Sequence, residues 1–245
     1  MPTNYTMDAG EVTVEFKDRN TDGSAKMWNG YSDGPVQDSY YKLFADWKDW
    51  AGGANWTVTE VGTCTQTLID VAGGGLALAT GALENDGITL QHGKGTDGTA
   101  GEWVLPAAGK QIYWEMEAAI DDETQSDVFL GLSITDTAIT ASVPANLIGF
   151  MKVDGSTDMV PTSRAGSAST TTTGTVTMGT AVRKKYGFKV TGLSKVEFYV
   201  NDALVATHLT NIPATEMRPS VEILTGEANA ATLSLYGKLR VAVSA

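Results

Sequence analysis

Alternation of apolar and polar residues runs through most of the chain and predicts short β-strands. The clearest stretch is 184–209, where three alternating runs are separated by turns at 191–194 and 201–203. Period-two alternation places every second side chain in a core, and the turn residues tolerate the positive φ angles of hairpins. The predicted core face comprises Tyr186, Phe188, Val190, Val196, Phe198, Val200, Val205, Thr207 and Leu209. This stretch therefore predicts a three-stranded antiparallel meander.

The same pattern recurs from residue 55 to the end of the sequence. Alternating apolar positions occur in 111–120, in 128–134 and in 233–243, and the last run is long enough to cross a whole sheet. The threonine-rich stretch 165–180 is interpreted as a polar strand or an exposed edge. About a dozen strands are too many for one open twisted sheet. The predicted fold is therefore all-β: an antiparallel two-sheet jelly-roll sandwich.

The first 53 residues differ from the rest. Residues 1–34 are irregular apart from a strand-like run at 11–16, whereas 36–50 carry aromatic and apolar residues at three- and four-residue spacing. Such spacing predicts a short amphipathic helix, which Pro35 could begin and Gly52-Gly53 could end. We therefore expect two parts: an N-terminal arm with one short aromatic helix (1–53) and a sandwich (54–245). The aromatic stripe either covers an end of the sandwich or docks on another subunit.

Composition excludes several classes of protein. The formal net charge of −12 disfavours binding to nucleic acid, and acidic surfaces usually keep a protein soluble. The sequence shows no secretory signal and no apolar run of membrane-spanning length, so we expect synthesis in a cytoplasm and no membrane contact. Cys64 is the single cysteine, which rules out an intrachain disulfide and predicts a buried structural thiol.

Candidates for catalysis are few. His92 precedes a glycine-rich turn, and His208 is expected to be an exposed strand residue. Glu115 and Glu117 are two apart on one predicted strand, as in sandwich glycosidases that hold a nucleophile and an acid. In laminarinase-like hydrolases three acids follow E-x-D-x-(x)-E, whereas here residues 119–120 are apolar and the middle acid is Glu. A solvated strand face is the default, so the sequence predicts no catalytic residue and no enzyme. Acidic loops lack EF-hand spacing, so no metal or cofactor is predicted either.

Four stretches (55–78, 110–137, 149–157 and 196–223) together resemble concanavalin A-like sandwich proteins of tailed bacteriophages. The similarity covers roughly residues 54 to 243 and is one of strands and turns rather than of a catalytic signature. It implies a non-enzymatic virion structural protein, such as a capsid decoration or cement protein on the outer capsid surface. Its implied partners are the major capsid protein and neighbouring copies of the same chain in a homo-oligomer. The predicted contact residues are Val12, Val14, Phe16, Trp28, Tyr31, Tyr40, Trp47 and Trp50.

The alternative function is recognition of a glycan, as a carbohydrate-binding module or as a tail or head-fibre component. Sugar-binding surfaces need exposed aromatic rings near polar groups, and four aromatic residues point away from the inferred core. These are Tyr113, Phe129, Tyr199 and Tyr236. A generic sandwich module within a larger assembly is the third option.

Overall fold

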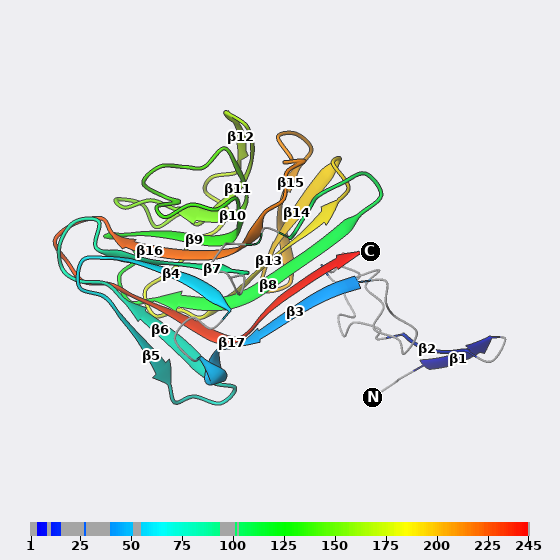
Figure 1. The fold of residues 1–245 in the computed structure, drawn as a ribbon, viewed down its shortest axis with the longest axis horizontal. Helices are drawn as coiled ribbons and strands as arrows, with labels where there is room; N and C mark the ends of the chain where they lie inside the picture. Colours follow the sequence, from blue (N-terminus) through cyan, green and yellow to red (C-terminus); the bar gives the residue numbers. More distant parts are fainter. Residues whose placement is uncertain are drawn as a thin grey trace.

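Two antiparallel sheets pack face to face in the computed structural model, which describes residues 4–8, 11–15, 27, 40–50, 55–93, 101 and 103–244 (Figure 1). One sheet has seven strands in the order β12 (Ala168–Thr171), β11 (Val160–Ala165), β10 (Asn146–Lys152), β9 (Ser126–Ser133), β16 (Arg218–Thr225), β7 (Gly87–His92) and β4 (Trp56–Val61). The other has eight: β15 (Ala203–His208), β14 (Lys195–Val200), β13 (Lys184–Thr191), β8 (Gln111–Ile120), β17 (Thr232–Ser244), β6 (Gly75–Ala79) and β5 (Thr65–Ile69), with β3 (Tyr40–Asp46) also paired to β17. The predicted all-β, two-sheet sandwich is confirmed.

The core lies between the sheets and follows the alternation of the sequence. On β8 the residues that face the core are Ile112, Trp114, Met116, Ala118 and Ile120, each at most 1% exposed. The ring of Trp114 stacks on that of Phe188 from β13, with centroids 5.1 Å apart and planes 6° from parallel. The alternation of apolar and polar residues therefore correctly predicted which side of β8 faces the core.

In one strand of the predicted meander, the alternate residues that face the core differ from those predicted. On β15, Ala206 and His208 are buried in the core in place of Thr207 and Leu209, and Leu209 is 66% exposed. Val205 is only partly buried against the core. The cause is a bulge in the β14–β15 pairing next to Phe198, which sets His208 opposite Val196. A bulge shifts which side chains face the core, and the sequence pattern does not show where it falls.

His208 is consequently buried, not exposed as expected. Its Nδ1 lies 3.0 Å from Ser163 Oγ, and its Nε2 lies 3.0 Å from Thr172 Oγ1. The ring packs on Phe198, and burial lowers the pKa of His208. Both ring nitrogens are thus satisfied by hydroxyl groups from the neighbouring sheet, which makes this histidine part of the core.

The helix predicted for 36–50 is wrong where the structure describes it. Residues 40–46 form β3, which pairs with β17 from Ser244↔Tyr40 to Lys238↔Asp46, and a single 3-10 turn, η1 (Trp47–Asp49), follows. Strand β17 extends beyond the end of β6 and offers unpaired backbone groups there, which β3 satisfies. Trp47 is 1% exposed and packs on Trp56 with ring centroids 5.4 Å apart. Residues 40–50 therefore pair and pack with strands of the sandwich.

The strand predicted in the N-terminal arm is present. β2 (Glu11–Glu15) pairs with β1 (Asn4–Asp8) as a separate two-stranded sheet. The threonine-rich stretch contains β12, the edge strand of the seven-stranded sheet, as predicted. In the part of the chain that the structure describes, no helix is long and apolar enough to cross a membrane.

A loop closes the outer face of the seven-stranded sheet. Phe129, Ile139 and Leu147 form a second hydrophobic cluster there, and each is fully buried. The loop is anchored by Glu222, a fully buried side chain of β16 that accepts hydrogen bonds from the backbone N–H groups of Ile139 and Thr140 at 2.7 and 2.6 Å. The outer face of the seven-stranded sheet is therefore covered where this loop packs on it.

Candidate functional site

Strand β8 lies near the middle of the eight-stranded sheet and turns Glu115 outward, on the face opposite the core. The pairing registers set Glu115 between Gly187 of β13 and Arg240 of β17. Its Oε1 accepts a hydrogen bond from Arg240 Nη1 at 2.9 Å, and its Oε2 lies 3.9 Å from Lys185 Nζ. Glu115 is only 5% exposed, so it is not the solvated strand residue that the sequence suggested.

Glu117 stands in the next row of the same face, between Lys185 on β13 and Tyr236 on β17. It forms an ion pair with Arg183, whose Nε and Nη2 both point to Glu117 Oε2. The guanidinium of Arg183 also lies over the ring of Tyr236, with its central carbon 4.6 Å from the ring centroid. Arg183 is therefore held by one charge contact and one cation–π contact.

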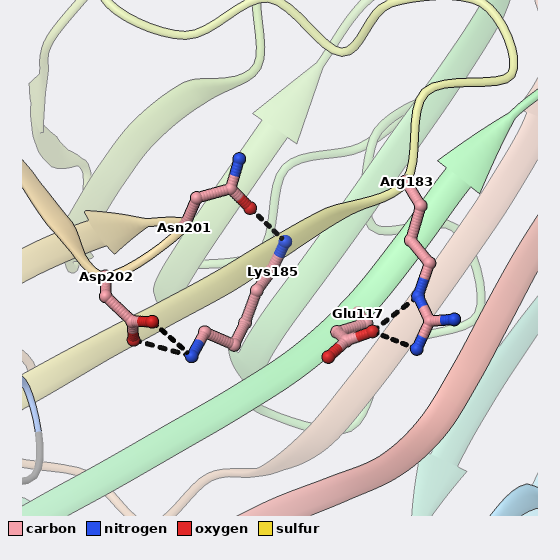
Figure 2. A pocket seen from close by; sticks show the side chains of 5 residues that line it. All are labelled: Glu117, Arg183, Lys185, Asn201 and Asp202. Atoms are coloured by element: carbon pink, nitrogen blue, oxygen red, sulfur yellow. Dashed lines mark hydrogen bonds and ion pairs between the residues drawn. The ribbon is translucent and has the colours of Figure 1, made fainter. Parts of the chain in front are cut away.

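An open hollow of about 330 Å³ lies at this end of the face, lined by Glu117, Arg183, Lys185, Asn201 and Asp202 (Figure 2). The β14–β15 turn places the last two of these residues, because Asn201 and Asp202 have φ angles of 49° and 66°. Asn201 Oδ1 accepts from the backbone N–H of Lys185 at 2.9 Å. Both Asp202 carboxylate oxygens lie 2.6 Å from Lys185 Nζ.

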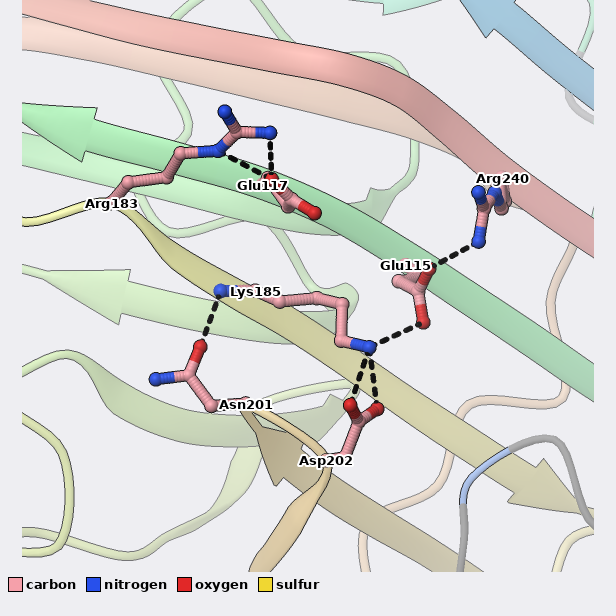
Figure 3. A network of polar contacts seen from close by, with 7 residues as sticks. All are labelled: Glu115, Glu117, Arg183, Lys185, Asn201, Asp202 and Arg240. Carbon is pink, nitrogen blue, oxygen red and sulfur yellow. Dashed lines mark hydrogen bonds and ion pairs between the residues drawn. The ribbon is translucent and has the colours of Figure 1, made fainter. Parts of the chain in front are cut away.

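The two rows join into one network through Lys185. Its ammonium group lies between Asp202 on one side and Glu115 on the other, and Arg240 approaches Glu115 from β17 (Figure 3). Three cationic and three anionic side chains thus lie side by side, and they come from β8, β13, β17, the residue before β13 and the β14–β15 turn. Such a surface presents hydrogen-bond donors and acceptors side by side, which suits a ligand whose groups both donate and accept.

The sequence analysis singled out the two glutamates but missed their partners. Period-two alternation from Arg183 through Lys185 to Lys189 is visible in the sequence and marks a basic strand face. That this face lies beside the acidic face of β8 depends on the pairing of β8 with β13, which the sequence does not state. Across the described residues, no group of three or more His, Cys, Asp or Glu side chains is arranged to hold a metal ion.

The four aromatic residues expected on a sugar-binding surface differ in accessibility. Tyr113 is fully buried, Tyr199 is 3% exposed and burial raises its pKa to about 12, and Phe129 lies in the cluster beneath the loop of the other sheet. Lys189 Nζ lies 5.3 Å from the centroid of the Tyr113 ring, and burial lowers the pKa of Lys189. Of the four, Tyr236 is the one that is partly accessible.

Of the eight residues predicted to contact a partner, five lie among the described residues. Val12 and Val14 lie on β2, opposite Met7 and Tyr5, and Tyr40 begins β3. Trp47 is part of the core, and Trp50 packs against it, so Trp47 does not form the exposed docking face that was expected. Phe16, Trp28 and Tyr31 lie outside the described residues. The partner role of these residues stays a prediction.

Comparisons with known proteins establish the fold. No protein-family model matches the sequence, and no curated protein matches it significantly. Among solved structures, the chain is similar to the catalytic domain of an endo-1,3-β-glucanase (laminarinase) from Thermotoga petrophila RKU-1, with 11% identity, a TM-score of 0.56, and coverage of 83% of this chain and 97% of that one. It is also similar to an endo-β-1,4-glucuronan lyase from the fungus Trichoderma reesei (9% identity, TM-score 0.53, coverage 82% and 94%) and to the carbohydrate recognition domain of Emp46p (10% identity, TM-score 0.52, coverage 82% and 95%).

These similarities show a concanavalin A-like sandwich, and they correct one expectation. The chain was expected not to be an enzyme, because Glu115 and Glu117 were interpreted as a solvated strand face and the resemblance implied a structural protein. The same architecture carries a glucanase and a lyase, so that prediction was wrong to treat the fold as non-catalytic. None of these three structures concerns a phage or a capsid, and the virion role stays a prediction.

Proposed function

We propose that this protein binds carbohydrate on the outer face of the eight-stranded sheet, at the hollow beside Glu117. The observation that carries the proposal is the hollow itself, which sets carboxylate, amide, ammonium and guanidinium groups around about 330 Å³ of open space. That volume is at the lower end of the range for small-ligand sites, roughly 300–1,000 Å³. The sharing of this fold with a carbohydrate recognition domain supports the same reading.

The chemistry of the hollow suits a sugar better than a purely anionic or cationic ligand. Every sugar hydroxyl both donates and accepts, and Arg183 offers donors while Asp202 and Glu117 offer acceptors. The Arg183–Glu117 pair and the Lys185–Asp202 pair leave the lining close to charge balance, so no strong field selects one sign of ligand. Partly exposed ion pairs contribute little to stability. A ligand can therefore replace some of their hydrogen bonds at little cost to the folded protein.

Binding is tested by screening the full chain against immobilised glycans and titrating those that bind. Arg183→Ala should weaken binding of such a glycan by about tenfold, because one charge-assisted hydrogen bond contributes roughly 1.5 kcal/mol. Arg164→Ala, on β11 of the other sheet, is the matched control and should leave binding unchanged. Equal affinities of the Arg183→Ala variant and the unmodified chain would count against this site, as would the failure of every glycan to bind.

Glycoside cleavage is a second candidate, favoured by the two outward-facing carboxylates of β8. Residues two apart on a strand are separated by about 6.7 Å along it, which is comparable to the roughly 5–9.5 Å between the carboxyl groups of glycosidases. The test incubates any bound polysaccharide with the protein and measures new reducing ends. Glu115→Gln and Glu117→Gln should each abolish the formation of reducing ends, whereas Glu197→Gln, on β14, should not. If the unmodified chain forms no reducing ends, cleavage is eliminated and binding alone remains.

A further inference from the structure

The middle of the outer sheet face is covered, whereas the hollow at one end of it is open. Tyr113 and Glu115 of β8 and Tyr199 of β14 point outward on either side of β13, yet none is more than 5% exposed. By contrast, the Arg183 and Asp202 side chains at the hollow are 46% and 45% exposed. Other residues of the same chain therefore shield the centre of the proposed binding face.

Met27 is one residue that does so. It is distant in sequence from β13, but its side chain lies directly against Gly187 and is only 3% exposed. A Cβ atom built on Gly187 would stand 2.4 Å from Met27 Sδ and 3.0 Å from Met27 Cε. The lack of a side chain at Gly187 thus creates the space that the thioether fills.

This space is part of the proposed site. Gly187 is the direct cross-strand neighbour of Glu115, and it lies opposite Tyr199 on the other side. Lys185, which lines the hollow, is two residues away on the same strand and on the same face. A chain of sugar units that extended from the hollow along β13 would next meet Gly187 and the methionine on it.

We propose that Met27 is an intramolecular occupant of the carbohydrate-binding face, and that ligand and Met27 compete for the space over Gly187. The inference rests on the proposed function. Methionine is suited to such a role because its flexible, unbranched side chain fills irregular gaps and gives up few directional contacts when it leaves. The apolar face of a sugar ring can take the place of the thioether over Gly187, and its hydroxyl groups can form hydrogen bonds that a methionine side chain does not offer.

The binding test compares the unmodified chain with Met27→Ala, using linear hexasaccharides as probes: laminarihexaose, cellohexaose and a β-1,4-glucuronate hexamer. Removing the competitor should tighten binding of at least one probe by between about tenfold and a hundredfold, since that corresponds to burial of one methionine side chain. Met151→Ala, a partly buried methionine on the other sheet, is the matched control and should not change affinity. Unchanged or weaker binding by Met27→Ala would overturn the competition.

A second measurement follows Met27 directly, by its rate of oxidation with hydrogen peroxide and peptide mass spectrometry. A saturating hexasaccharide should accelerate oxidation of Met27 while leaving Met151 unaffected, the reverse of the protection that ligands normally give. Protection of Met27 by ligand would refute the proposal. Gly187→Ala should also accelerate oxidation of Met27 without any ligand, because the added Cβ would stand 2.4 Å from Sδ and force the thioether to shift. An unchanged rate would show that this contact does not bury Met27.

These outcomes separate the two proposals. If neither a hexasaccharide nor any immobilised glycan binds to the unmodified chain or to Met27→Ala, the proposed function fails and the competition fails with it. If another glycan of the screen binds, that glycan replaces the hexasaccharides as the probe. If a hexasaccharide binds and Arg183→Ala weakens it, but Met27→Ala has no effect, the function stands and the competition alone is wrong.

Discussion

Glu222 provides the most direct test of what closes the outer face of the seven-stranded sheet. Its carboxylate is fully buried and accepts four hydrogen bonds: from Thr89 Oγ1 (2.6 Å), Ile139 N (2.7 Å), Thr140 N (2.6 Å) and Thr140 Oγ1 (2.7 Å). Three of the four come from the loop that covers the seven-stranded sheet. Replacing Glu222 by Gln changes one acceptor oxygen into an amide donor with almost no change in volume.

The expected cost follows from these contacts. Each oxygen serves one backbone N–H and one hydroxyl, so in either amide orientation one backbone N–H loses its acceptor, while the hydroxyl can rotate and accept instead. A buried donor without a partner costs about 1–3 kcal/mol, and the remaining bonds lose their charge assistance. Part of this is regained because a neutral amide is easier to bury than a carboxylate. We expect Glu222→Gln to lower the free energy of unfolding by about 2–3 kcal/mol, which corresponds to roughly 4–12 °C in Tm for a chain of this size.

The assay is urea unfolding followed by tryptophan fluorescence, together with amide hydrogen exchange of residues 137–141. Exchange in this loop should accelerate more than exchange in β8, because the loop loses its anchor first. Glu227→Gln, an exposed glutamate beyond the end of β16, is the control and should change stability by less than about 0.5 kcal/mol. A loss below about 0.5 kcal/mol for Glu222→Gln as well would refute the reasoning from its four contacts.

Two further predictions test the corrected parts of the fold. Trp47→Ala should destabilise the protein by about 3–5 kcal/mol in urea unfolding, because Trp47 is a core side chain packed on Trp56; unchanged stability would favour the docking role instead. Burial is the main cause that lowers the pKa of His92 to about 4, so between pH 6.5 and 4 the unfolded chain binds more protons than the folded one and stability falls as the pH falls. The full pKa shift would correspond to a loss of about 3 kcal/mol in the free energy of unfolding, and solvent screening at the partly exposed ring reduces this to about 1–2 kcal/mol. Urea unfolding at several pH values should show a smaller pH dependence for His92→Gln than for the unmodified chain.

The sequence by itself determined the class of fold and most of the core. Period-two alternation identified β8, β9, β13 and β17, because a strand that is buried on one face must place an apolar side chain at every second position. It failed for residues 40–46, where aromatic residues at helical spacing lie in a strand. There the unpaired backbone groups of β17 favour a strand, because β3 forms hydrogen bonds with them. The local sequence pattern does not show that such a partner strand is present.

The candidate site was decided by the tertiary structure. The sequence located Glu115 and Glu117 on one face, but Arg183, Lys185, Asp202 and Arg240 come from three other segments of the chain. Which of them meets which glutamate depends on strand order and register, and a bulge or a one-residue slip would change every pair. The burial of His208 and the contact of Met27 with Gly187 arise in the same way, from long-range packing that joins residues far apart in sequence.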